Sequence, residues 1–252
     1  MSAGLCLGID PHAALLAEWG TTLEDFGARA VEAAAGVVDW VKPQAAFYEA
    51  HGARGFAALE STIERARAAG LRVIVDAKRG DIGSTMQGYA DAWLRDGLWL
   101  TVNPYLGVGA LAPAIDAALR HGGGLFVLCA TSNPEGARIQ QAVTATGRTV
   151  AAEVLDEVQA RGSGSGRLGV VIGATVDLAA YGLDLAAAPD APILAPGFGA
   201  QGARLAELRR VFGPAADRVV ANVSREALVA GRAGLRARLV ELRDEALRGL
   251  SA

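Results

Sequence analysis

Residues 71–85 read Leu-Arg-Val-Ile-Val-Asp-Ala-Lys-Arg-Gly-Asp-Ile-Gly-Ser-Thr, a mostly apolar run followed at once by charged residues and glycines. A short run rich in Val, Ile and Leu is typical of a strand that is covered on both faces of a parallel sheet. Similar runs recur along the chain, at residues 5–9, 37–41, 98–102, 125–129, 168–172, 193–195 and 218–221. The pattern therefore predicts a parallel sheet of eight strands.

Segments with a helical pattern separate most of these runs, at residues 22–35, 56–69, 87–95, 110–120, 149–160 and 204–211. Strands and helices that alternate over 252 residues predict a (β/α)8 TIM barrel, a single domain covering residues 1–252. An open doubly wound sheet is the second choice. A charged, amphipathic helix at residues 232–250 is expected to pack on the outside of the barrel.

Two segments lack a clear periodic pattern of apolar residues. Residues 133–147 follow the fifth strand and predict a long loop, which could act as a lid over a substrate. Residues 161–167, Arg-Gly-Ser-Gly-Ser-Gly-Arg, predict a flexible surface turn.

The composition excludes several classes of protein. A formal net charge of −3 gives no indication of a nucleic-acid or membrane partner. No signal peptide and no apolar stretch long enough to cross a bilayer is visible, so we expect a cytoplasmic protein. Cys6 and Cys129 lie inside apolar runs, as buried thiols in a reducing compartment would, and no Cys/His cluster predicts a metal site.

Polar or special residues follow the predicted strands where each strand ends. In a (β/α)8 barrel these ends open onto one face, where substrates bind. One shared site is therefore expected to draw on residues Asp10, Lys42, Lys78, Asn103, Ser132, Gly173, Pro196 to Gly199 and Asn222 to Arg225.

The charged residues after the third strand predict the chemistry. Asp76 and Lys78 are two apart on a strand, so both side chains leave on the same face, inside the barrel mouth, and Asp81 follows in the loop. Flanking carboxylates position an ammonium and favour its charged form. Lys42 ends the second strand and would be costly if buried unpaired, and Asp10 and Asp76 on the neighbouring strand ends could supply the carboxylates that it needs. The structural alternative for Asp76, Lys78 and Asp81 is a salt-bridged barrel core. The alternative for Lys42 is a side chain that reaches solvent.

A phosphate site is predicted next to these charges. The glycine-rich turn at residues 196–202 exposes backbone N–H groups between the seventh strand and its helix, where barrels commonly bind phosphate. Arg225, after the eighth strand, could grip the same phosphate with two hydrogen bonds. Ordinary turn chemistry and an exposed arginine at a helix start remain the alternatives.

These motifs resemble those of the orotidine 5′-phosphate decarboxylase family. The family signature is similar to Asp-x-Lys-x-x-Asp-Ile-x-x-Thr at residues 76–85. Val-Lys-Pro-Gln-x-Ala-Phe-Tyr-Glu at 41–49 and Val-Asn-Pro-Tyr-Leu-Gly at 102–107 look like the longer, type 2 bacterial branch. The resemblance covers residues 5–231, nearly the whole chain.

The resemblance implies cofactor-free decarboxylation of orotidine 5′-monophosphate (OMP) to UMP and CO2 in pyrimidine biosynthesis, with no metal. It implies that Lys78 protonates C6 within a charge network, and that the enzyme is a homodimer. The resemblance implies that the catalytic residues are Lys42, Asp76, Lys78 and Asp81. Asp81, together with the substrate-binding residue Thr85, would be donated to the partner's site. Asp10 and Lys42 would hold the ribose hydroxyls, Ser132 the pyrimidine, and Gln201 and Arg225 the 5′-phosphate. Further pocket residues would be Ile82, Asn103, Pro196 and Gly199.

Two rival functions share this barrel. A metal-dependent relative such as 3-hexulose-6-phosphate synthase has the same Asp-x-Lys-x-x-Asp pattern but an acidic residue at the end of strand two, where this chain has Lys42. A catalytically silent phosphate-binding protein would have lost one of the four charged residues, and all four are present.

Overall fold

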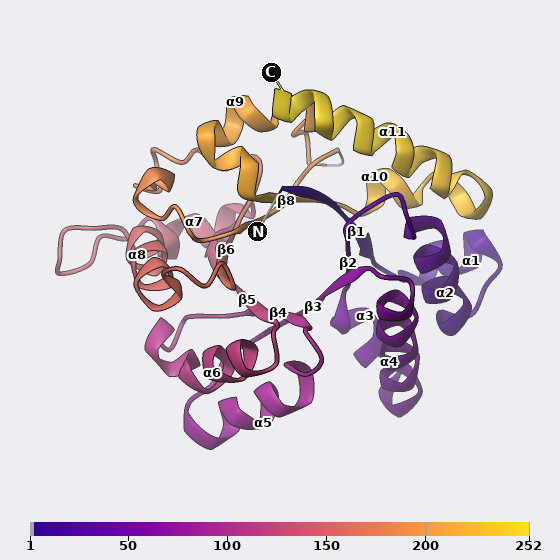
Figure 1. The fold of residues 1–252 in the computed structure, drawn as a ribbon, viewed down its shortest axis with the longest axis horizontal. Helices are drawn as coiled ribbons and strands as arrows, with labels where there is room; N and C mark the ends of the chain where they lie inside the picture. The colour runs from indigo at the N-terminus through magenta and orange to yellow at the C-terminus, as the bar shows by residue number, and fades with distance from the viewer. Residues whose placement is uncertain (1–2, 200, 252) are drawn as a thin grey trace.

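The computed structural model describes residues 3–199 and 201–251. Its eight strands pair in parallel in chain order and close into a barrel, with β1 beside β8. Figure 1 looks down this barrel and shows the helices arranged around the ring of strands. The predicted (β/α)8 fold is thereby confirmed. The strands are β1 (Gly4–Ile9), β2 (Trp40–Pro43), β3 (Arg72–Arg79), β4 (Trp99–Val102), β5 (Gly124–Ala130), β6 (Leu168–Ile172), β7 (Ile193–Pro196) and β8 (Val219–Val223).

Helices cover the outside of the strands. Their bounds are α1 (Ala13–Trp19), α2 (Leu23–Ala34), α3 (Ala45–Glu49), α4 (Gly52–Ala68), α5 (Gly83–Trp93), α6 (Ala112–Arg120), α7 (Pro134–Gln140), α8 (Val150–Gly162), α9 (Leu208–Phe212), α10 (Arg225–Leu228) and α11 (Gly231–Ser251). The described residues also form the 3-10 turns η1 (Val108–Leu111), η2 (Leu185–Ala187), η3 (Leu205–Glu207) and η4 (Gly213–Arg218). Only η2 lies between β6 and β7, so that unit has a short turn in place of a helix.

Two separate apolar clusters explain why the strands are apolar on both faces. Outward residues such as Leu5, Leu7 and Ile9 pack in the large cluster between strands and helices. The second cluster closes the lower part of the barrel interior with one residue from each strand: Cys6, Trp40, Ile74, Trp99, Phe126, Val171, Leu194 and Val220. Buried apolar surface of this kind is the main favourable term in folding.

The structure differs most clearly from the prediction in two segments. The second strand begins at Trp40, because the backbone N–H groups of Val37 and Val38 still bond to Ala34 at the end of α2. The segment 133–147 is not all loop: its first half forms α7, which has Pro134 at its start. Its second half is closed by an isolated antiparallel bridge between Val143 and Thr149, and it projects outward from the ring (Figure 1).

The C-terminal helix starts at Gly231, one residue before the predicted start, and packs outside the barrel. In Figure 1, α11 runs past β8 and β1 to cover their outer side. Its apolar stripe of Leu235, Leu239 and Leu242 is buried there. Within the described part of the chain, none of the helices combines the length and the apolar character that a membrane crossing requires.

Candidate active site

A cavity of about 570 Å³ opens at the carboxyl ends of the strands. Its floor is apolar, formed by Leu128, Val171 and Leu194, which top the cluster inside the barrel. Its walls are polar and come from most of the strand ends. Residues on these walls include Asp10, His12, Lys42, Gln44, Asp76, Lys78, Thr101, Pro196, Gln201, Asn222 and Arg225.

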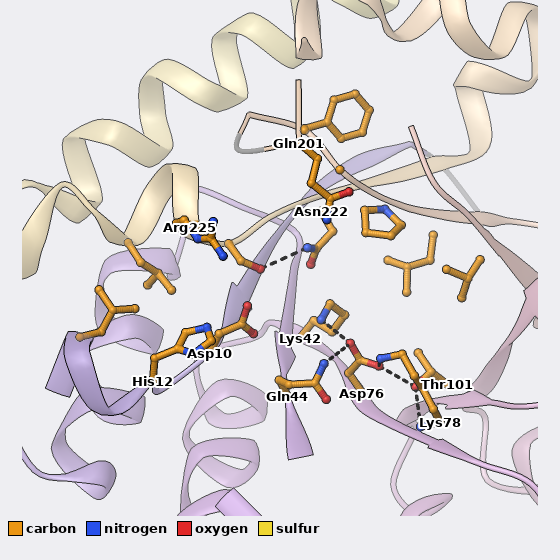
Figure 2. A pocket seen from close by; sticks show the side chains of 18 of the residues that line it. Asp10, His12, Lys42, Gln44, Asp76, Lys78, Thr101, Gln201, Asn222 and Arg225 are labelled. Atoms are coloured by element: carbon orange, nitrogen blue, oxygen red, sulfur yellow. Dashed lines mark hydrogen bonds and ion pairs between the residues drawn. The ribbon is translucent and has the colours of Figure 1, made fainter. Parts of the chain in front are cut away.

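Asp76 is the centre of the polar contacts, as Figure 2 shows. Its Oδ2 accepts hydrogen bonds from Lys42 Nζ at 2.6 Å and from Gln44 Nε2 at 2.9 Å. Its Oδ1 accepts from Lys78 Nζ at 2.5 Å and from Thr101 Oγ1 at 2.9 Å. Four donors from β2, β3, β4 and the start of α3 therefore fix one carboxylate and two ammonium groups relative to one another.

The two lysines differ in their access to solvent. Lys42 and Asp76 are each only 5% exposed, whereas the side chain of Lys78 is 45% exposed. Lys42 is thus a buried partner of the carboxylate, and Lys78 is the ammonium that reaches the open cavity. They are also the only lysines in the chain, all other basic side chains of that size being arginines. That concentration is a sequence signal in its own right.

Opposite charges keep the buried pair ionised. Burial opposes the ammonium of Lys42, but the attraction of Asp76 and Asp10 outweighs it and raises the pKa of Lys42 above its ordinary value. Burial also opposes the carboxylate of Asp76, but the charges of Lys42 and Lys78 hold its pKa well below the usual range. At neutral pH the carboxylate is therefore ionised and surrounded by positive charge.

The backbone of β3 bends to aim Lys78. Lys78 has a φ of +49°, in the left-handed region that a non-glycine residue rarely adopts, and the pairing register of β3 shifts between Val75 and Arg79. The N–H of Lys78 donates to Thr101 Oγ1 at 3.0 Å. Arg79 forms an ion pair with Glu49 of α3. The predicted meeting of Asp76 and Lys78 is present, but through a kink rather than through a regular strand.

The far side of the cavity is formed by backbone and by neutral or basic groups. Gly197 and Gly199 have φ of +114° and +76°, which lets the turn after β7 fold tightly. Ser132 Oγ donates to Gln201 Oε1 at 2.9 Å across the turn. Arg225 lines the cavity at the start of α10 (Figure 2). Pro196, Gln201 and Arg225 thus line the same cavity.

Several predicted site residues do not line this cavity. Asp81 Oδ1 accepts from the N–H of Ile82 at 2.8 Å, and no contact joins it to Lys78, so it does not flank that ammonium within one chain. Asn103 Oδ1 accepts from the N–H of Tyr105 at 3.0 Å, which gives it a role in the turn after β4. The remaining predicted residues outside the lining of this cavity are Ile82, Thr85, Ser132, Gly173, Gly199 and Val223.

Some site residues were given no role from the sequence. Gln44 lies two residues after Lys42 at the same strand end, and Thr101 is a lone polar residue inside an apolar strand, so both positions could have been noticed. His12 and Asn222 also line the cavity. Asp10 Oδ1 and Asn222 Oδ1 are buried without a hydrogen-bond partner among the described residues, which leaves both oxygens available to a bound molecule.

Sequence comparison places the chain among one group of proteins. Residues 3–238 match the profile described as "Orotidine 5'-phosphate decarboxylase / HUMPS family". The chain is 52% identical over 238 residues to the orotidine 5′-phosphate decarboxylase of Streptomyces coelicolor, covering 89% of this chain and 84% of that protein. It is 53% identical over 240 residues to that of Salinispora arenicola, covering 90% and 85%.

Solved structures agree with the sequence comparison. A Streptomyces avermitilis protein described as an orotidine 5′-phosphate decarboxylase superposes with a TM-score of 0.92 at 48% identity, covering 98% of this chain and 91% of that one. The OMP decarboxylase of Leishmania donovani superposes with a TM-score of 0.78 at 31% identity, covering 98% and 94%. Both fold and sequence are therefore shared over nearly the full length.

Proposed function

The chain belongs to the orotidine 5′-phosphate decarboxylase / HUMPS family, and from this membership we propose that it converts OMP to UMP and CO2 without a cofactor. The observation that carries the proposal is the arrangement around Asp76: a half-exposed ammonium, Lys78, held 2.5 Å from a buried carboxylate at the cavity wall. Such an ammonium can both stabilise and protonate a carbanion.

The reaction needs one proton and no electron acceptor. The bond between C6 and the carboxylate carbon breaks, CO2 leaves, and the electron pair stays on C6. Lys78 then gives a proton from Nζ to C6, which yields UMP and a neutral amine. Because the side chain of Lys78 is partly exposed, solvent can return the proton before the next turnover.

Asp76 has two roles in this scheme. Its hydrogen bonds hold the ammonium of Lys78 in place before the substrate arrives, so that little reorganisation is needed in the transition state. Its negative charge would also repel a substrate carboxylate placed beside it.

The rest of the cavity fits a nucleotide. Gln201 and Arg225 would bind the 5′-phosphate together with the backbone N–H groups of the turn after β7. Ser132 does not line the cavity itself but donates a hydrogen bond to Gln201, which does, and from there it would hold the pyrimidine. Asp10, with its unpartnered oxygen, and Lys42 would hold the ribose hydroxyls. Binding at the remote phosphate can then be used to assemble the reacting end of the site.

A metal-dependent reaction fits these side chains less well. Lys42 and Lys78 place two ammonium groups on the one carboxylate at the cavity wall, where a divalent cation would need free oxygen ligands. In residues 3–199 and 201–251, His, Cys, Asp and Glu side chains form no group of three or more that could hold a metal ion.

The proposed function is tested by following the loss of OMP absorbance with and without EDTA. We expect UMP to form at the same rate in both, since no step uses a metal. Loss of turnover in EDTA would favour the metal-dependent relative. OMP binding without any turnover would favour a silent phosphate-binding protein.

We also propose that the enzyme is a homodimer in which Asp81 and Thr85 complete the partner's site. Both residues follow Lys78 closely in the sequence, yet neither lines the cavity of its own chain. Large apolar side chains are exposed on the segments after the adjoining strands β3 and β4: Ile82, Leu106 and Tyr105, the last 79% exposed. Exposed apolar side chains gathered near a site favour a protein–protein contact.

Mixing two inactive variants tests the shared site. Lys78→Ala and Asp81→Ala subunits, combined under conditions that exchange subunits, should regain about a quarter of wild-type activity. Half of the dimers would be mixed, and each would hold one site with both wild-type residues. Activity is measured by OMP turnover, and subunit exchange by differently tagged chains. No recovery despite proven exchange would count against the shared site.

We further propose that the reaction takes place in the cytoplasm. The two cysteines, Cys6 and Cys129, are both free and buried, as expected for a protein in a reducing compartment.

A further inference from the structure

The long helix α11 packs behind the segment to which the proposed function assigns the phosphate. We call residues 196–199 and 201–203 the phosphate turn. We propose that Arg238 of α11 is a positioning residue: through Glu226 of α10, it holds the phosphate turn in the shape that binds the 5′-phosphate. This inference rests on the proposed function and adds a residue that lies outside the cavity.

Glu226 touches the phosphate turn directly. A Cβ built on Gly199 would lie 2.5 Å from both Cβ and Cγ of Glu226, so the backbone of the turn rests on the stem of that side chain. Only glycine allows so close an approach, and its φ of +76° is also one that glycine favours. Glu226 directly follows Arg225, which lines the cavity. One side chain therefore supports the turn next to the residue that would grip the phosphate.

Arg238 fixes the carboxylate of Glu226. Its Nη2 forms an ion pair with Glu226 Oε1, and both side chains are about one-third exposed. Its Nη1 also bonds Glu241 of the same helix at 2.8 Å. A guanidinium held by two carboxylates keeps a defined orientation, and charge-assisted hydrogen bonds of this kind are stronger than neutral ones. Glu226 is therefore tethered to α11.

Little else fills the space beside this contact. A cavity of about 160 Å³ lies against the phosphate turn, lined in part by Gly199, Gly202, Arg204, Glu226 and Glu245. Close packing normally holds a turn in one shape, and a gap removes such contacts. The stem of Glu226 consequently contributes a large share of the support that the turn receives from this side.

The pair also matters for charge. A free carboxylate at Glu226 would lie behind a turn that binds a phosphate dianion, and like charges repel. Arg238 neutralises that carboxylate while orienting it. Removing Arg238 would therefore loosen the turn and expose the phosphate to an uncompensated negative charge, and both effects weaken phosphate binding.

The test compares two substrates that differ only in the phosphate, OMP and orotidine. Arg238→Met is expected to lower kcat/KM for OMP about tenfold, mainly through KM, as expected for the loss of one charge-assisted contact. The kcat/KM of Arg238→Met for orotidine, measured at high enzyme concentration, should equal that of the wild type. The inhibition constant of UMP should rise by the same factor as KM. Glu226→Gln keeps the stem and a hydrogen-bond acceptor, and should cost less than Glu226→Ala.

Arg236→Met is the matched control. Arg236 lies on the same helix and bonds the carbonyl oxygens of Ala33 and Ala35 at the end of α2, away from the phosphate turn. Equal losses of kcat/KM for OMP and orotidine, or an Arg238→Met variant that behaves like Arg236→Met, would overturn the inference. Failure of the wild-type protein to decarboxylate OMP would instead contradict the proposed function.

Discussion

Replacing Lys78 by alanine is expected to lower kcat for OMP by at least about 10³-fold, because the substitution removes both the charge that stabilises C6 and the proton that C6 receives. Without the Lys78 side chain, Asp76 still accepts hydrogen bonds from Lys42, Gln44 and Thr101, which hold it in place. UMP should therefore still bind. The measurement is OMP turnover at saturating substrate together with the dissociation constant of UMP.

Stability separates a chemical role of Lys78 from a structural one. Its ion pair with Asp76 is partly exposed, and such pairs contribute about 0–1 kcal/mol to the free energy of unfolding. Lys78→Ala should therefore unfold in urea at nearly the wild-type midpoint. Wild-type turnover in a folded Lys78→Ala variant would refute Lys78 as the proton donor.

Asp76→Asn is expected to abolish turnover and also to destabilise the fold, by about 3–5 kcal/mol, because it leaves the ammonium of Lys42 buried without a carboxylate. The double variant Lys42→Met/Asp76→Asn removes that ammonium as well. It should regain most of the lost stability, since buried ion pairs can often be replaced by apolar groups without loss. It should remain inactive. The measurements are urea unfolding and OMP turnover.

The effect of Asp76→Asn on stability should also depend on pH. The pKa of Asp76 is lower in the folded chain than its ordinary value of 3.8, so its stabilising contribution is fully present above that value and is lost as the pH falls toward the folded pKa. The stability difference between wild type and Asp76→Asn should thus be large at neutral pH and shrink in acid. A double variant no more stable than Asp76→Asn at neutral pH would contradict the assignment of Lys42 as a buried ammonium.

The fold was largely predictable because barrel strands are buried on both faces. Runs such as residues 168–172 are apolar at every position, and that run coincides with β6. The second strand was misplaced because Val37 and Val38 are equally apolar, yet they belong to the turn that ends α2. Apolar character reports burial and cannot by itself distinguish a strand from a buried turn. The short helix α7 was missed because its residues show no apolar period.

The site was predictable to the extent that strand ends meet on one face of a barrel. Lys42, Asp76 and Lys78 meet as expected. The left-handed backbone at Lys78 could not be read from its residue type, since lysine rarely adopts it. Gln44 was missed because a neutral polar residue just after a strand commonly belongs to an ordinary turn, and Thr101 because a single hydroxyl inside an apolar strand often bonds only nearby backbone. The position of Asp81 outside its own cavity could not follow from spacing alone.

The most direct test of the central claim is a crystal structure of the enzyme with UMP bound. We expect Lys78 Nζ to lie within about 3.5 Å of C6 of the pyrimidine, the reach needed for proton transfer. We also expect Asp76 to accept a hydrogen bond from that ammonium and the phosphate to lie between Gln201 and Arg225. A structure in which Lys78 points away from C6, toward bulk water or the outer helices, would contradict the central claim.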